Sequence, residues 1–497
     1  MYRPRPCPAA GSLRPLARCL AAAFATAAIF PPIAAIAADG LLAGMSEPLA
    51  LDLPRVPAAM PAPPSRAPAT LYVANCNDSG PGSLRDVING AADGDTVDMS
   101  QLACSTISLT TGAIVFAQDQ LALVGPGRHR LAIDGTGNVL TDGLLVHLGF
   151  GTVIVEDLAL TGGRKYRSDT NALGGCIQSQ GNVLLRDSSI TGCKARSMSN
   201  HGSLGGGIWT QGSTYLQHSE VSGNTTVAAG NGYASGGGVY ALGGLTTIYS
   251  LVMGNSAYSP STTPSFGGGV FTRGYAAILE STVAYNQAAR MGGVALADTT
   301  SVNSSIFQST ITGNIADRVG GVYSRWPLYL YNSTIADNMA MVSIDTQGHG
   351  SAAGLQMGPA LLTFHSSILS DNFTLDNGER RDLDGLQGVL MVGTHNLITG
   401  TPLPPPPDTI GFTPALGPLQ DNGGPVPTRE PIRGESYAID SGGFPTNGVF
   451  TYDQRGNGFP RWIGSAVDIG AFETDPDRIF INGFNFGLPV ASAAPVE

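Results

Sequence analysis

Two carboxylates and an imidazole recur at one position of a repeated phrase in this sequence. Asp157, Asp187 and His218 each lie three residues before an aliphatic residue of the phrase. Stacked one above another, such groups could share a proton, and this gives one carboxyl group the raised pKa that a glycoside hydrolase or polysaccharide lyase uses. The alternative is structural, because a polar side chain at a strand end can bond to the backbone. We favour the structural alternative. Later repeats align other residues at this position: Tyr249, Glu280, Gln308, Asn332 and His365.

A second column, one residue earlier in each repeat, becomes apolar toward the C-terminus. It contains Phe307, Tyr331 and Phe364. Neighbours such as Ile306 and Leu330 are expected to face the core, so alternation predicts that this column faces outward. An outward aromatic ladder is either a platform for carbohydrate rings or a surface covered by another part of the chain. We favour the covered surface, since residues 411–473 need a partner to pack against.

The elements that position both columns are predicted to be short repeated strands. Between residues 153 and 400, a Ser or Thr pair is followed by an aliphatic residue and, in most copies, by Asn three positions further on. Six of the aliphatic residues are Ile190, Val221, Val252, Val283, Ile311 and Ile335. Their spacings are 31, 31, 31, 28 and 24, and a Gly-Gly pair travels with them. Such a period indicates stacked repeats, and the residue types indicate strands joined by turns.

We therefore predict an all-β fold, a single-stranded right-handed parallel β-helix that forms a solenoid of the pectate-lyase type. In each coil, inward aliphatic residues should stack into ladders. Asn at the bend tolerates a left-handed backbone and can hydrogen-bond along the stack, while Gly supplies positive φ where the chain turns.

Changes of composition divide the chain into six regions. These are a signal peptide (1–37), a Pro-rich linker (38–70), an N-terminal cap with the first coils (71–135), the β-helix repeats (136–400), a closing segment (401–473) and a tail (474–497). In the cap, Ser83 is expected to begin and Gly94 to end a short amphipathic helix. This helix would cover the open end of the coils, where strand edges are exposed.

The N-terminal region predicts export. A basic start is followed by an uncharged run and by Ala35-Ile36-Ala37, a small-x-small cleavage site. A transmembrane anchor is the alternative, but the Ala-rich run is interrupted by Pro31-Pro32. The chain carries 37 acidic and 26 basic side chains, and no basic patch is visible, so we expect no nucleic-acid partner. We expect a soluble mature chain without a membrane span.

The cysteines that follow the signal are even in number: Cys76, Cys104, Cys176 and Cys193. In an oxidising compartment this predicts disulfides. Of the three possible pairings, proximity favours Cys76 with Cys104 and Cys176 with Cys193. Free buried thiols are the alternative. No Cys-x-x-Cys spacing, His-Glu-x-x-His or P-loop is present, so we expect no cofactor and no metal.

The closing segment contains charged residues among glycines: Asp440, Asp453, Arg455, Asp468 and Glu473. Carboxylates of this kind can bind calcium, yet the loop patterns of known calcium sites are absent. We predict a structural network of Arg455 with carboxylates that holds the end of the chain together.

Both ends of the chain resemble a known family. Asn77-Asp78-Ser79-Gly80-Pro81-Gly82 near the start, and Leu416-Gly417-Pro418-Leu419-Gln420-Asp421-Asn422-Gly423-Gly424-Pro425 and Val467-Asp468-Ile469-Gly470-Ala471-Phe472-Glu473 near the end, resemble bacterial secreted β-helix proteins with a choice-of-anchor Q domain. The repeats are also similar to coils of polymorphic outer-membrane proteins. Residues 478–484 resemble short terminal tags of secreted Gram-negative proteins. The resemblance implies a β-helix secreted to the surface or exterior of a Gram-negative bacterium, and it implies no activity.

Three functions remain open at this point. The first, which we favour, is a secreted or cell-surface structural or adhesive β-helix without a catalytic site. The second is a polysaccharide lyase or glycoside hydrolase, which would gather acidic and basic residues in one outward groove. The third is non-catalytic carbohydrate binding on the ladder of Phe307, Tyr331 and Phe364, with an extracellular or cell-surface polysaccharide as partner. The fold supports all three.

Overall fold

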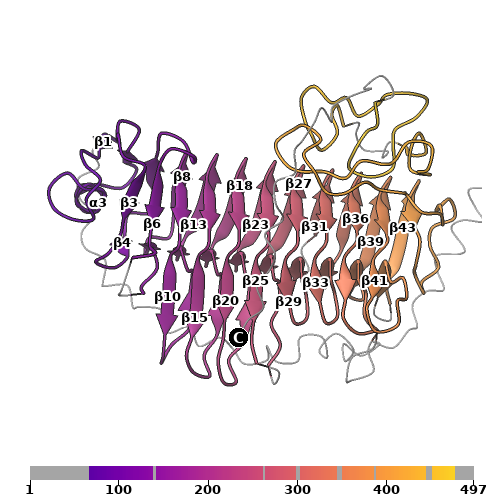
Figure 1. Ribbon diagram of the computed structural model, residues 1–497, viewed down its shortest axis with the longest axis horizontal. Coiled ribbons are helices and arrows are strands. Elements are labelled where there is room, and N and C mark those ends of the chain that lie inside the picture. Colours follow the sequence, from indigo (N-terminus) through magenta and orange to yellow (C-terminus); the bar gives the residue numbers. More distant parts are fainter. Residues whose placement is uncertain are drawn as a thin grey trace, which may run out of the picture. The chain divides into compact units, whose positions relative to one another are not determined.

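Short parallel strands, stacked coil upon coil, make up most of the described chain (Figure 1). The computed structural model describes residues 67–475, except 138–140, 261–262, 298–302, 344–349, 386–387 and 444–449. The predicted signal peptide, most of the linker and the tail from 476 lie outside the described residues. The strands form five sheets, which we call A to E. A full coil runs through them in the order A, B, D, E and C. The all-β parallel β-helix is therefore confirmed.

Sheet A has 12 strands and sheet B has 11, all in parallel register. The strands of sheet A are β1 (Thr70–Tyr72), β2 (Thr96–Asp98), β5 (Leu121–Val124), β8 (Thr152–Glu156), β13 (Asn182–Arg186), β18 (Ser213–Gln217), β23 (Gly244–Ile248), β27 (Tyr275–Leu279), β31 (Ser304–Phe307), β35 (Leu328–Tyr331), β39 (Leu361–His365) and β43 (Leu390–Thr394). The strands of sheet B are β3 (Thr106–Ser108), β6 (Ala132–Asp134), β9 (Ala159–Thr161), β14 (Ser189–Thr191), β19 (Glu220–Ser222), β24 (Leu251–Met253), β28 (Thr282–Ala284), β32 (Thr310–Thr312), β36 (Thr334–Ala336), β40 (Ile368–Ser370) and β44 (Leu397–Ile398).

Sheets C, D and E have 10, 8 and 3 strands. The strands of sheet C are β4 (Ile114–Phe116), β7 (Leu145–His147), β12 (Ile177–Ser179), β17 (Ile208–Thr210), β22 (Val239–Ala241), β26 (Val270–Thr272), β30 (Val294–Leu296), β34 (Val322–Ser324), β38 (Leu355–Met357) and β42 (Leu383–Gly385). The strands of sheet D are β10 (Arg164–Arg167), β15 (Lys194–Ser197), β20 (Thr225–Val227), β25 (Ser256–Tyr258), β29 (Gln287–Ala288), β33 (Ile315–Ala316), β37 (Met339–Ala340) and β41 (Phe373–Thr374). The strands of sheet E are β11 (Ala172–Leu173), β16 (Ser203–Leu204) and β21 (Ala234–Ser235).

The main core lies between sheets A, B and C, and the predicted aliphatic ladder runs through it. Ile190 is in register with Val221 and Val221 with Val252, and the ladder continues to Ile311 and Ile335. These side chains are at most 1% exposed. Because like residues stack at coil spacing, each aliphatic side chain fills the space between its neighbours in the adjacent coils.

Asparagine residues form a continuous hydrogen-bonded ladder at the turn after sheet B. The Asn224 Oδ1 accepts from the Cys193 N–H (2.9 Å), and Asn224 Nδ2 donates to Asn255 Oδ1 (3.0 Å). The same bonds repeat from Asn255 to Asn372. The expectation that asparagines bond along the stack is confirmed. The asparagines do not use the left-handed conformation that they tolerate, since the positive φ belongs to the preceding residue, such as Gly223 (φ 63°).

The Gly-Gly pairs and the Asn ladder recur together because they touch. A Cβ on the second glycine, Gly207, would lie 3.2 Å from the Asn224 side chain. A Cβ on the first, Gly206, would lie 2.6 Å from the backbone of Thr225, which begins the sheet D strand β20. The first glycine therefore allows close approach of two backbones, and the second makes room for the asparagine.

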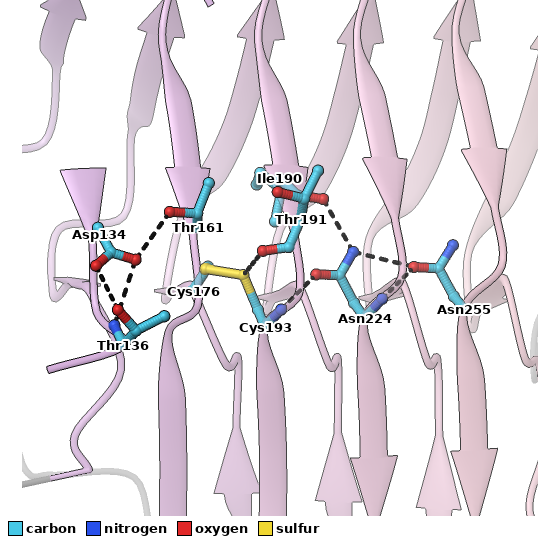
Figure 2. Close-up of a disulfide and its surroundings, with 9 residues drawn as sticks. All are labelled: Asp134, Thr136, Thr161, Cys176, Ile190, Thr191, Cys193, Asn224 and Asn255. Atoms are coloured by element: carbon cyan, nitrogen blue, oxygen red, sulfur yellow. Dashed lines mark hydrogen bonds between the residues drawn. A yellow bond between two sulfur atoms is a disulfide. The ribbon is translucent and has the colours of Figure 1, made fainter. Parts of the chain in front are cut away.

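The first coil of this series replaces the glycine and asparagine with a disulfide (Figure 2). Cys176 occupies the second-glycine position and Cys193 the asparagine position, as the registers of Ile177 with Ile208 and of Ile190 with Val221 show. Figure 2 shows Cys193 in line with Asn224 and Asn255. The second disulfide joins Cys76 to Cys104 in the cap. Both predicted pairings are confirmed.

Sheets D and E form a second layer over the outer face of sheet C. The middle residues of the sheet C strands point away from the main core, yet Trp209, Tyr240, Phe271 and Tyr323 are fully buried. A Cβ on Gly236, which follows sheet E, would lie 2.9 Å from the Tyr240 Cβ. The inner residues of sheet D, such as Ala195 and Ala257, are small. They leave room for the large rings of sheet C.

One helix caps the first coils. Helix α3 (Leu84–Gly90) begins where Ser83 accepts a hydrogen bond from the Asp86 N–H, as predicted, and it buries Leu84 and Ile88. It ends four residues earlier than predicted, because Ala91 leaves the helical conformation and Gly94 forms a later turn (φ 84°). Within the described residues, no helix is long and apolar enough to cross a membrane.

The closing segment, residues 401–475, lies along the outside of sheet B in successive coils. Figure 1 shows this segment, in yellow, beside the strands from β27 to β39. Gln454 accepts from the Thr310 hydroxyl (2.6 Å) and donates to the Ser281 carbonyl (3.0 Å) and the Thr282 hydroxyl (2.9 Å). The Ala471 N–H donates to the Thr334 hydroxyl (3.1 Å). The segment thus bridges several coils through single residues.

Candidate functional site

The column of Asp157, Asp187 and His218 is defined by its backbone conformation. These residues have φ of 53°, 48° and 48°, and the later members Tyr249, Glu280, Gln308 and Asn332 share this left-handed conformation. At the next coil Ser366 (φ 45°) takes the position, so the assignment of His365 to this column is wrong by one residue. The residue types vary widely while the conformation stays constant. This pattern supports the structural interpretation.

A ladder of serines explains how that turn is held. From Asp187 to Ser366 the left-handed residue is followed by a serine, whose hydroxyl donates to the carbonyl two positions before it, as Ser219 does to Gln217 (2.8 Å). Its N–H donates to the serine hydroxyl of the next coil, as Ser219 does to Ser250 (3.1 Å). After Asp157 the following residue is Leu158, whose N–H donates to the Ser188 hydroxyl of the next coil (3.2 Å). The Asp187 side chain lies outside this ladder and is exposed. The turn therefore depends on serine, which is why the preceding residue is free to vary.

The predicted aromatic ladder exists in part. The rings of Phe307 and Tyr331 are stacked with centroids 5.0 Å apart, and both are partly exposed. The placement of Phe364 in this ladder is wrong, because Phe364 pairs in register with Leu330 and is fully buried. His365 takes the outward place, with its ring 5.1 Å from Tyr331. The spacing from Ile335 to its register partner Leu369 is 34 residues, against 24 in the coil before it, so spacing alone does not fix the register of this coil.

The C-terminal part of the chain reaches this ladder. The ring of Phe450 lies 6.2 Å from Phe307. A Cβ on Gly456 would lie 3.0 Å from the Tyr249 hydroxyl. Of the aromatic residues in the segment 411–473, Phe472 is buried at 4% exposure, whereas Trp462 is 58% exposed. These contacts support the covered surface over an open carbohydrate platform at Phe307.

The charged residues of the closing segment form the predicted network. Asp453 pairs with Arg455 (2.6 Å), both are buried, and the guanidinium lies over the ring of Phe472. The Glu473 carboxylate accepts from the N–H groups of Ile463 and Asp468 (3.0 and 2.9 Å), and burial raises the pKa of Glu473 to about 8. Each carboxylate thus holds local backbone. Among the described residues, no cluster of His, Cys, Asp and Glu has the geometry of a metal site.

The structure contains a polar cavity that sequence reasoning missed. It has a volume of about 720 Å³ and lies where the second layer begins. Sheet D starts at β10, whereas the sheet C strands β4 and β7 belong to earlier coils that have no sheet D strand. The outer face of these two strands is therefore left without its second layer. Val115, Val146 and Leu148 form the apolar part of the lining.

Charged residues converge on the same cavity. Lys165 and Arg167 come from β10, Asp142 from the loop before β7, and Gln178 from β12. Asp142 pairs with Arg167 (2.9 Å), and its carbonyl accepts from Lys165 Nζ (2.9 Å). Lys165 is only 6% exposed; its burial and the charge of Arg167 lower its pKa to about 8. A signal was present in the sequence, because Lys165 aligns with Ala195, Thr226 and Ala257 in a column of small residues.

Comparison with known proteins adds a single structural likeness. No family model and no curated protein matches the chain. The chain is similar to a solved structure described as pectate lyase Pel9A, with 12% sequence identity and a TM-score of 0.43. The match covers 82% of this chain and 97% of that one.

Proposed function

We propose that the chain is exported and acts outside the cell as a structural or adhesive β-helix, as its resemblance to secreted choice-of-anchor Q proteins suggests. The observation that carries this proposal is the closing segment along sheet B. Arg429 bonds to the Gly417 carbonyl (2.8 Å) and pairs with Asp337, while Ser366 donates to the Gly443 carbonyl (2.6 Å). Together with Gln454, these contacts tie coils that are separated along the stack. A coil stack braced in this way suits a load-bearing or surface-displayed role.

Export is the first part of the proposal to test. A small-x-small site at Ala35-Ile36-Ala37 and two disulfides both fit an oxidising compartment. Mass spectrometry of protein recovered from the culture medium or cell surface should give an N-terminus near Ala38 and two intact disulfides. Recovery of the chain in the cytosol, with Met1 retained and four free thiols, would reject export.

Binding without cleavage is the second part. We expect the purified mature chain to adhere to bacterial surface or extracellular polysaccharides on a glycan panel, and to release no products from them. Product release is followed by the appearance of new reducing ends and of unsaturated sugars. Turnover of any polysaccharide on the panel would replace this proposal with the enzyme alternative.

A polysaccharide lyase or glycoside hydrolase is the second candidate, and one observation favours it. The cavity at Lys165 gathers basic and acidic residues on the outside of the solenoid, as such an enzyme requires. A lysine with a pKa near 8 is also within reach of acid–base chemistry at neutral pH. The column of Asp157, Asp187 and His218 gives this candidate no support. If turnover is seen, the Lys165→Met protein should lose it and the Asp187→Asn protein should keep it.

A further inference from the structure

The cavity lies where sheet D begins, and hydrogen bonds hold the backbone along one part of its lining. The wall residues Gly112 and Ala113 are held by Arg85, whose guanidinium donates to both carbonyls (2.8 and 2.7 Å). Arg85 in turn pairs with Asp78 (2.8 Å), which also accepts from the Thr111 N–H (2.7 Å). The capping helix α3 therefore positions this side of the cavity. Asn171, another residue of the lining, accepts from the Gly202 N–H (2.7 Å).

The two cations of the cavity, Lys165 and Arg167, have different partners. Asp142 neutralises Arg167 through their ion pair, and Arg167 also donates to the Tyr166 carbonyl (2.8 Å). Lys165 is different, because its ammonium has three protons and is positioned by a bond to a backbone carbonyl rather than to a carboxylate. The other carboxylate of the lining, Asp169, is exposed. Buried ammonium groups are stabilised by an anion, and a ligand carboxylate would supply one.

The remaining lining suits a polyhydroxylated ligand. Val115 is 51% exposed and, with Val146, Leu148 and Leu173, offers an apolar surface. Gln178 and Asn171 can donate to and accept from hydroxyl groups. The volume of about 720 Å³ lies within the range of small-ligand sites. An apolar strip, amide groups and a buried cation match the C–H face, the hydroxyls and the carboxylate of an acidic sugar.

We propose that this cavity binds an acidic saccharide, with the carboxylate of a uronic acid residue placed against the Lys165 ammonium group. The proposal rests on the adhesive function proposed above, to which it adds the chemical class of the partner. Asp142 positions Lys165 and neutralises Arg167. The cap and the first coils then form a recognition site at one end of the stack, while the closing segment braces coils further along it.

The test is calorimetric titration of the full secreted chain with oligosaccharides of galacturonic or glucuronic acid. The matched ligands are the same oligosaccharides after their carboxyl groups are reduced to alcohols. We expect the acidic forms to bind at least about tenfold more tightly. Lys165→Met should remove this preference, whereas Lys194→Met, the same change one coil later and outside the cavity, should retain it. Equal affinity for acidic and reduced forms, or unchanged affinity in Lys165→Met, would overturn the proposal.

A pH series makes the test independent of whether Lys165→Met folds. The other charged or titratable groups that line the cavity are Asp142, Arg167, Asp169 and His201. Only the protonated lysine attracts the carboxylate, so affinity of the unmodified chain should be full below pH 8 and fall above it. Lys165→Arg stays charged and should show no such fall. A pH-independent affinity in the unmodified chain would contradict the role of Lys165.

If the unmodified chain binds other surfaces but no acidic saccharide, this inference fails while the adhesive function stands. If it binds nothing, the adhesive function fails as well.

Discussion

A left-handed backbone conformation at the end of the sheet A strands from β8 to β43 decides how Asp157, Asp187 and His218 should be interpreted. Serine hydroxyls hold this turn at Asp187 and His218, and the side chain of Asp187 is exposed. Sequence spacing placed these residues in one column correctly. It could not show that their common property is a φ angle rather than a shared chemistry, because Asp, Asn and His are all tolerated in that conformation for steric reasons.

Substitutions at Asp187 and Ile311 should separate outward from inward positions. Asp187→Asn should change the free energy of unfolding by at most about 1 kcal/mol, because Asn also tolerates a left-handed backbone. Ile311→Asp places a charge in the fully buried aliphatic ladder and should cost several kcal/mol. Urea denaturation followed by circular dichroism measures both. A large loss of stability in the Asp187→Asn protein would show that its carboxylate has a role that the turn does not explain.

Asp382 predicts a pH dependence of stability. Its carboxylate ends the asparagine ladder by accepting from the Asn372 N–H and Nδ2 (2.8 and 2.9 Å), and burial raises its pKa to about 6 from 3.8. Since the folded carboxyl keeps its proton to higher pH than the unfolded one, its contribution to stability is full below pH 4 and is lost between pH 4 and 6. Asp382→Asn removes this loss and should stabilise the protein by about 1–3 kcal/mol at pH 7, with little change at pH 4. Lower stability of Asp382→Asn at pH 7 in urea denaturation would contradict this.

At the scale of the strands, much of the coil could be predicted from residue types. Ile190 and Val221 occupy equivalent rungs, and Gly-Gly and Asn recur together, as the sequence indicated. Sheet D and the second layer could not be predicted in this way. Their inner positions are small residues such as Ala195 and Ala257, which give no periodic apolar signal, and the rings they cover, such as Tyr240, also fit an exposed strand face. The cavity at Lys165 depends on this layer and was missed with it.

The disulfide of Cys176 and Cys193 should be replaceable by the pair found in the other coils. In Cys176→Gly/Cys193→Asn, the new amide can donate to Asn224 and extend the ladder, as Asn224 does to Asn255. Cys176→Ala/Cys193→Ala provides no such bonds and should lose about 2–4 kcal/mol of stability, a typical disulfide contribution. The Gly/Asn protein should lose measurably less. Thermal unfolding of the two proteins side by side measures the difference, and equal losses would show that position 193 does not belong to the ladder.

For the whole molecule, the closing segment makes the stability of distant coils interdependent. Three of its contact points are the threonines 282, 310 and 334, where earlier coils have Ser189, Glu220 and Leu251. The change to threonine in the covered coils was visible in the sequence, but it carried no information about which segment would cover them. Contacts such as Gln454 with Thr282 join residues 172 positions apart, which no local pattern predicts.

Gln454→Ala tests whether the hydrogen bonds of the closing segment hold it against sheet B. The change removes hydrogen bonds to three buried groups, the Ser281 carbonyl and the hydroxyls of Thr282 and Thr310, and should cost about 2–4 kcal/mol in that region. We expect limited proteolysis to release the closing segment early while the coils remain protected. The control is Gln217→Ala on the partly exposed outer side of sheet A, which should digest like the unmodified chain. Simultaneous loss of all protection would indicate that the closing segment and the coils unfold as one unit.

The asparagine ladder is closed at both ends by a side chain from the glycine column: Cys176 at the start and Asp382 at the finish. The coils between Cys176 and Asp382 are equivalent units. A duplicated coil could therefore be added between them without any change at either end of the ladder. The closing segment limits such duplication to coils before Ser281, because it contacts the later coils.

A second copy of residues 225–255 should therefore be accepted as an extra turn, and calorimetry should show a single transition at a similar temperature. A second copy of residues 315–338 would move Ser366 one coil, about 4.8 Å, away from Thr282 and break the alignment of the closing segment. We expect that protein to melt in two steps. If the two proteins with a duplicated coil unfold in the same way, the closing segment does not determine where an extra coil is accepted.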